Sequence, residues 1–134
     1  MPTVYYQHTL HLLPHSRPLI PIRLIGRPGF RPLDTLALLD SGADRCVFPE
    51  GFAVRLGLDL SAGIIVPLKG ATGGELSARI VPVTVELVGL AFDCHAAFTS
   101  GAIPYSFIGR EGIFESSKWG FRIGHGIIYF DPQP

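Results

Sequence analysis

The sequence predicts an all-β domain, either a barrel or a sandwich. It contains 16 glycines and 12 prolines, which interrupt the chain every few residues, and the segments between them are short, often alternating and rich in β-branched residues. With 134 residues, 47% of them hydrophobic and 16% charged, the chain fits one globular domain. We expect a single domain over 1–134, with an arm or irregular edge strand over 1–18 and a core over 19–130.

The first predicted strands lead to a carboxylate. Residues 19–24 alternate apolar and other residues before the turn signal at 26–29, and residues 36–39 form a continuous apolar run. That run ends at Asp40-Ser-Gly-Ala-Asp44, so a buried strand places an acid directly in a Ser/Gly turn. Residues 49–56, with Pro and Glu near the start and Gly57 after the end, predict a short helix.

A long hairpin is predicted next. The β-rich segments 64–69 and 75–88 flank a short glycine-rich tip at 70–74. Pro82 indicates that the second strand bends or lies at an edge there, and residues 90–98 continue the sheet.

Three further elements complete the expected fold. Residues 105–109 predict a short apolar strand, and residues 110–117 a short amphipathic helix. The aromatic and β-branched segment 119–130 predicts one closing strand, interrupted by glycines.

Composition disfavours several classes of function. Lys plus Arg and Asp plus Glu both number 11, so no net charge favours nucleic acid or an anionic membrane. The longest apolar runs are far shorter than the roughly 20 residues that cross a bilayer. The N-terminus has no readable secretory signal, which makes the cytoplasm the default expectation. We expect the two cysteines, Cys46 and Cys94, to be reduced and buried, and we expect no cofactor.

Asp40 is the residue in this sequence that most needs a chemical explanation. A carboxylate at the end of a buried strand is costly to desolvate, so it needs hydrogen-bond partners or a task. Ser41 offers a hydroxyl, and Gly42 permits a tight turn whose amides can face the carboxylate. Taken alone, Asp-Ser-Gly is more often a simple turn than a catalytic site.

The context of Asp40 favours catalysis. Leu38-Leu-Asp-Ser-Gly-Ala-Asp44 is followed by the glycine-tipped hairpin, and then by Phe107-Ile108-Gly109-Arg110. In this order and spacing, the three motifs resemble the retropepsin-like aspartic proteases, a family that includes the retroviral proteases and bacterial relatives. The resemblance covers residues 19–130 and implies a closed β-barrel, half of an acid protease, with a flap hairpin and one or two short helices. The chain is longer than a minimal retroviral protease, through the arm and the predicted helix at 49–56.

The resemblance also implies a homodimer. Acid-type peptide hydrolysis needs two carboxylates that share a proton, one acting as a base on water while the other donates to the scissile carbonyl. The sequence contains one Asp-Ser-Gly, so Asp40 would come from each of two chains to a two-fold axis. By analogy, residues 127–130 would help to form the dimer sheet.

Other residues receive roles by the same resemblance. Ser41 would lock the two active-site loops together, Gly42 and Ala43 would contact substrate, and Asp44 would lie at the cleft edge. Arg110, after Ile108 and Gly109, would pair with Asp44 in a structural role, and a bidentate pair is chemically reasonable. The flap over the substrate would consist of Gly70, Ala71, Thr72, Gly73 and Gly74.

The sequence therefore predicts an aspartic endopeptidase that cleaves extended peptide segments. A strand-like peptide suits a hairpin lid, and an apolar cleft would favour apolar side chains beside the scissile bond. The alternative is a weak or inactive dimerisation or peptide-binding module that keeps the fold.

A third and poorer hypothesis is a small β-barrel ligand binder, or a hydrolase of another class. It would use thiols and imidazoles as nucleophile, base or ligands, although Pro14 and the absence of helical periodicity disfavour a metal site in the arm. We expect no metal. The residues concerned are His8, His11, His15, Cys46, Cys94, His95 and His125.

Overall fold

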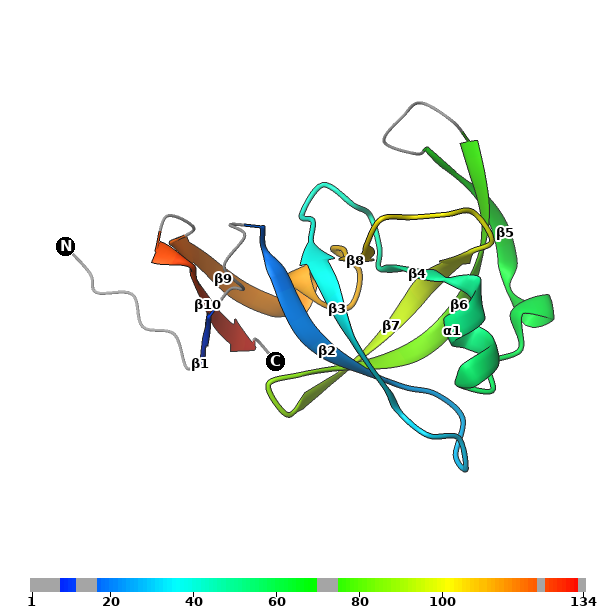
Figure 1. The fold of residues 1–134 in the computed structure, drawn as a ribbon, viewed down its shortest axis with the longest axis horizontal. Coiled ribbons are helices and arrows are strands. Elements are labelled where there is room, and N and C mark those ends of the chain that lie inside the picture. Colours follow the sequence, from blue (N-terminus) through cyan, green and yellow to red (C-terminus); the bar gives the residue numbers. More distant parts are fainter. Residues whose placement is uncertain (1–7, 12–16, 70–74, 123–124, 133–134) are drawn as a thin grey trace.

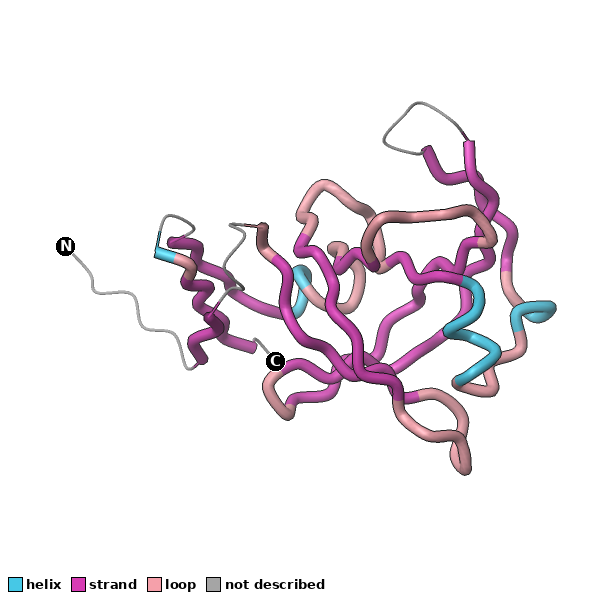
Figure 2. The backbone as a smooth tube through the Cα atoms, in the orientation of Figure 1, coloured by secondary structure: helices cyan, strands magenta, loops and turns pink. Residues whose placement is uncertain are grey.

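The structure is a computed structural model that describes residues 8–11, 17–69, 75–122 and 125–132. The described residues are mostly in β-strands, and helix occurs among them only in short segments (Figure 2). The elements in chain order are β1 (His8–His11), β2 (Leu19–Ile25), β3 (Leu33–Leu39), β4 (Val47–Pro49), α1 (Glu50–Arg55), η1 (Leu60–Ala62), β5 (Ile64–Lys69), β6 (Glu75–Leu87), β7 (Leu90–Thr99), β8 (Ser106–Ile108), η2 (Phe114–Ser116), β9 (Ser117–Arg122) and β10 (Ile127–Pro132).

Seven strands form one sheet in the order β2-β3-β8-β4-β7-β6-β5 (Figure 1). An additional antiparallel pairing of β2 with β6 closes six of these strands into a barrel and leaves β5 outside the closure. Closure removes the free edges of an open sheet, which would otherwise expose unpaired backbone groups. The predicted all-β class and closed barrel are confirmed.

Alternation along the strands explains the barrel interior. In β2, Ile20, Ile22 and Leu24 are buried while the residues between them are exposed. In β3, Ala37 and Leu39 are buried, and Leu36 is 42% exposed. The apolar run at 36–39 therefore does not mark a strand buried on both faces. One of its faces packs in the core and the other remains accessible.

Pro82 lies where β6 changes partner. On one side β6 pairs with β7 from Ala78 to Leu87, and on the other it pairs with β5 as far as Ile80 and with β2 from Thr84 onwards. Pro82 falls between these two partners, at a local edge of the strand. A proline has no N–H to donate to a ladder, so this position tolerates it.

The helix predictions had opposite outcomes. The helix expected at 49–56 is present as α1, with Pro49 before its first residue and Gly57 at φ +70° after its end. The helix expected at 110–117 is wrong, because that segment is a turn followed by the single 3-10 turn η2. Gly112 has φ +79°, a left-handed conformation that interrupts a helix.

The end of the chain forms a hairpin, and the expectation of one closing strand at 119–130 is also wrong. β9 and β10 pair antiparallel, and β1 pairs with the other edge of β10. The part of the arm at His8–His11 is thus an edge strand, one of its two expected forms. Both edges of β10 are occupied within the chain, so the strand expected to help form a dimer sheet is the middle strand of three.

The three-stranded sheet lies beside the barrel (Figure 1), and aromatic side chains join the two. Phe130 on β10 is fully buried, and its ring centroid lies 5.8 Å from that of Phe92 on β7 and 4.6 Å from that of Trp119 on β9. Phe130 and Ile128 belong to the same hydrophobic core as the barrel residues. The small sheet is therefore an integral part of the fold.

The longest helix in the described part of the chain, α1, has 6 residues. None of the helices there is long and apolar enough to span a membrane.

Candidate active site

Asp40 follows the last residue of β3 and begins a tight loop. Its backbone N–H donates to the carbonyl of Ile108 at 2.9 Å, which extends the pairing of β3 with β8 by one residue. Its carboxylate Oδ1 accepts the N–H of Gly42 at 3.0 Å, and its carbonyl accepts the N–H of Ala43 at 3.1 Å. The half-buried carboxylate is thus oriented by its own turn while the neighbouring Ser41 is exposed.

The segment after β8 holds this loop from the other side. We call the residues from Asp40 to Asp44 the active-site loop, after the role that the sequence analysis predicts for them. The N–H groups of Arg110 and Glu111 donate to the carbonyls of Ala43 and Asp44, each at 3.0 Å. Two motifs that are 66 residues apart in the sequence therefore lie in direct contact.

Side chains and close packing strengthen the same contact. Arg110 Nη2 pairs with Asp44 Oδ1, a single contact in place of the bidentate pair that we considered. Because the two side chains are 50% and 81% exposed, solvent screens this ion pair. Gly109 is buried against the backbone, and a β-carbon there would lie 2.3 Å from the carbonyl oxygen of Arg45. Glycine is therefore required at 109 by close approach of the two segments.

One face of the sheet beside Asp40 carries a row of apolar side chains. Leu38 lies opposite Leu19 on β2 and opposite Phe107 on β8, and Phe107 lies opposite Val47 on β4. Paired residues on neighbouring strands project from the same face, so these four side chains form a continuous row, which we call the apolar row. All four are half-buried. The sequence analysis did not identify this row, because it depends on the register of four strands.

A cavity of about 400 Å³ adjoins the apolar row. Leu36, on the same face of β3 as Leu38, lines it together with Phe52 of α1 and the segment that precedes β8. The remaining lining residues are Thr35, Pro49, Ile103, Pro104, Tyr105 and Ser106. The apolar face of β3 that begins beside Asp40 at Leu38 thus continues to a hollow at Leu36.

A cation also lies near this surface. The guanidinium carbon of Arg17 is 5.5 Å from the centroid of the Tyr105 ring, within the range of a cation–π interaction. The carbonyl of Pro18 accepts the N–H of Leu39 at 2.9 Å, which brings the beginning of β2 beside the end of β3. Arg17 was not singled out from the sequence, since it falls in the segment expected to be an arm.

The structure does not favour the hypothesis that thiols and imidazoles form the site. Cys46 and Cys94 are free, buried thiols, as expected, and the Cys94 thiol donates to the carbonyl of Val83 at 3.7 Å. A hydrogen bond with Cys46 and burial both raise the pKa of Cys94, so its reactive thiolate form is disfavoured. Among the described residues, no three His, Cys, Asp or Glu side chains come together in a group that could hold a metal ion.

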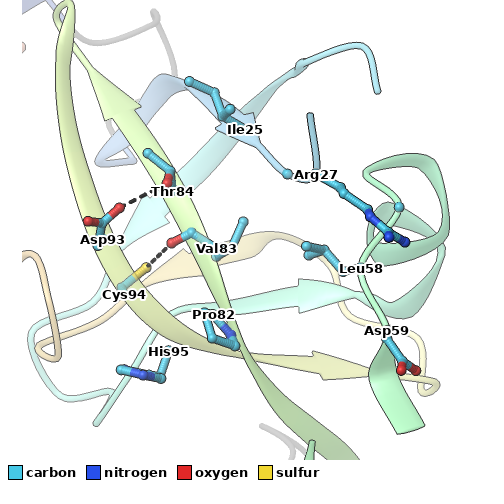
Figure 3. Close-up of a pocket in the computed structure, with 12 residues that line it drawn as sticks. Ile25, Arg27, Leu58, Asp59, Pro82, Val83, Thr84, Asp93, Cys94 and His95 are labelled. Atoms are coloured by element: carbon cyan, nitrogen blue, oxygen red, sulfur yellow. Dashed lines mark hydrogen bonds between the residues drawn. The ribbon is translucent and has the colours of Figure 1, made fainter. Parts of the chain in front are cut away.

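A second cavity, of about 690 Å³, lies away from the active-site loop (Figure 3). It is bordered by the β6–β7 pair and by the segments at 25–27 and 57–59. Cys94 and His95 lie at one side of it, and Thr84 donates to Asp93 at 2.9 Å. Among the described residues, none of those predicted for the aspartic protease site lines this cavity.

No protein-family model matches the sequence, and no curated protein does. Solved structures do match. A retropepsin-like aspartic protease from Rickettsia conorii aligns with a TM-score of 0.66 at 15% sequence identity, over 92% of this chain and 89% of that one. This chain has a retropepsin-like fold. The EIAV protease, solved in complex with the inhibitor HBY-793, aligns with a TM-score of 0.51 at 24% identity, over 80% of this chain and 88% of that one.

The predicted flap of this retropepsin-like fold is described only in part. β5 and β6 pair antiparallel from Ile64 opposite Ile80 to Lys69 opposite Glu75, so the two arms of a hairpin are present. The expected tip at 70–74 lies outside the described residues. Ile64 and Ile65 in β5 are 72% and 60% exposed, which shows that this arm stands outside the barrel core.

Proposed function

We propose that this protein is an aspartic endopeptidase that acts as a homodimer, with Asp40 of each chain forming a catalytic dyad. The observation that carries the proposal is the position of Asp40, at the end of a barrel strand in an Asp-Ser-Gly turn that orients its carboxylate. It is supported by the retropepsin-like fold and by the two similar structures, both of which are of proteases.

The chemistry follows from placing two such carboxylates side by side. Two carboxyl groups at close range cannot both ionise easily, because their negative charges repel, so the pair retains one proton. The ionised carboxylate removes a proton from a water molecule, which attacks the scissile carbonyl, and the protonated partner donates to the carbonyl oxygen. The sequence contains one Asp-Ser-Gly, so the second carboxylate comes from a second chain.

The surroundings of Asp40 favour an extended substrate with apolar side chains. The apolar row offers apolar contact beside Asp40, and the cavity of about 400 Å³ at Leu36 lies further along the same face of β3. A strand-like peptide would hydrogen-bond to the active-site loop at Gly42 and Ala43 and to the flap at 70–74. In this proposal Ser41 joins the two loops across the dimer axis, and Arg110 with Asp44 supports them.

The test is the cleavage of a mixed peptide library, followed by mass spectrometry at about pH 4 and about pH 8 over a protein dilution series. Asp40→Asn should lower turnover by about 1,000-fold or more while leaving the circular dichroism spectrum unchanged. Asp34→Asn is the matched control, because Asp34 lies on β3, the strand that leads to Asp40, but its side chain is 71% exposed and pairs with Arg23. This control should cleave as the wild type does.

Three results support the proposal together. Products disappear in Asp40→Asn, the specific activity falls on dilution, and activity is greater on the acidic side of neutrality because the dyad shares a proton. Retained activity in Asp40→Asn overturns it. The absence of any cleavage at all concentrations would instead favour the inactive dimerisation or peptide-binding module.

A further inference from the structure

We propose that Glu111 is a positioning residue, which anchors the active-site loop to strand β7 through its carboxylate. The inference rests on the proposed function for its catalytic consequence, and it concerns the rigidity of the same site. Glu111 follows Arg110 in the turn between β8 and η2. Its backbone and its side chain bind two different parts of the barrel.

The backbone of the turn binds the active-site loop. The N–H of Glu111 donates to the carbonyl of Asp44 and that of Arg110 to the carbonyl of Ala43, while Asp40 donates its own N–H to Ile108. Three backbone hydrogen bonds, of 2.9 to 3.0 Å, therefore connect the loop with the end of β8 and the turn. The position of the turn determines the position of the loop.

The side chain of Glu111 binds β7. The backbone N–H of His95 donates to both carboxylate oxygens, at 2.8 Å to Oε2 and 3.2 Å to Oε1, and the imidazole Nδ1 lies 3.0 Å from Oε1. The carboxylate is 30% exposed and the imidazole is 64% exposed. The bonds to the backbone N–H do not depend on the protonation of the imidazole, so they do not require a charged histidine.

The turn that carries Glu111 is closely packed on both sides. A β-carbon on Gly109 would lie 2.3 Å from the Arg45 carbonyl oxygen, and one on Gly112 would lie 2.5 Å from the β-carbon of Cys94 on β7. The turn is therefore packed directly between the active-site loop and β7, with a glycine at each contact. Between these two glycines, Glu111 supplies the carboxylate that binds β7, so a displacement of the turn would be transmitted to Asp40.

The test compares three variants. Glu111→Ala removes the anchor, whereas Glu111→Gln keeps one oxygen that can accept the N–H of His95. Glu115→Ala is the matched control, because Glu115 is an exposed glutamate nearby whose side chain makes no hydrogen bond or ion pair within the described part of the chain. Steady-state kinetics on a cleaved library peptide and amide hydrogen exchange are measured for each.

We expect Glu111→Ala to lower kcat by about 10- to 100-fold with KM changed less than about twofold, and Glu111→Gln to recover most of the loss. The amides of Arg110, Glu111 and Asp40 should exchange about tenfold faster or more in Glu111→Ala and at the wild-type rate in Glu115→Ala. Unchanged exchange at these amides overturns the proposal, as does a kcat equal to that of Glu115→Ala.

The exchange measurement separates this inference from the proposed function. If the wild type shows no Asp40-dependent cleavage, the proposed function fails, and the exchange rates still decide whether Glu111 holds the loop. If Glu111→Ala does not fold, Glu111→Gln carries the same comparison, with a smaller increase in exchange and a smaller loss of kcat. Faster exchange throughout the barrel, in whichever of the two variants folds, would show a general structural role and overturn the proposal.

Discussion

Phe130→Ala should strongly destabilise the protein, because Phe130 joins the three-stranded sheet to the barrel. Its side chain is 0% exposed and contacts two other aromatic rings, at centroid distances of 4.6 Å and 5.8 Å. Truncation of a fully buried Phe costs about 3–5 kcal/mol, of a total that is about 5–15 kcal/mol for a domain. At about 3–5 °C per kcal/mol for a chain of this size, the melting temperature should fall by about 10–20 °C.

Urea unfolding followed by the fluorescence of Trp119, the single tryptophan, measures this loss directly. Phe121→Ala is the control, since Phe121 also stacks on Trp119, at 6.4 Å, but is 48% exposed. It should cost about 1 kcal/mol or less, as expected for a side chain that buries half of its surface. Both variants are measured at the same protein concentration. If Phe130→Ala lowers the free energy of unfolding by less than about 1.5 kcal/mol, or by the same amount as Phe121→Ala, this account of how the sheet is held is refuted.

Three further predictions concern the site and its surroundings. Gly109→Ala should destabilise the fold by about 1–3 kcal/mol in urea titrations, because the new β-carbon would lie 2.3 Å from the carbonyl oxygen that follows the active-site loop. Gly51→Ala, where no atom lies within 4 Å, should not. Arg110→Ala should cost less than about 1 kcal/mol, since both side chains of its ion pair are at least 50% exposed, and a loss above about 2 kcal/mol would contradict this. Cys94, whose pKa is raised by a hydrogen bond with the other buried thiol and by burial, should resist alkylation at pH 8 until the protein is unfolded; rapid labelling of the native protein, detected by mass spectrometry, would contradict its burial.

Local patterns predicted most of the secondary structure. The alternation at 19–24, the apolar run at 36–39 and the helix signals at 49–56 depend on neighbours a few residues apart, and all three elements are present. The predictions of a helix at 110–117 and of one closing strand at 119–130 failed, because a glycine with positive φ interrupts each segment. Gly112, at φ +79°, ends the expected helix, and Gly126, at φ +66°, lies in the turn that divides the expected closing strand into two.

The sequence by itself determined that an acid stands at the end of a strand, in a Ser/Gly turn, because strand and turn chemistry are local. Tertiary structure alone decided what surrounds that acid. The apolar row needs the register of four strands, and the anchor of Glu111 on His95 joins a turn to β7 between residues 16 positions apart. Such contacts follow from barrel closure and from the close approach of Gly109 and Gly112 to their neighbours, which no spacing along a single chain reveals.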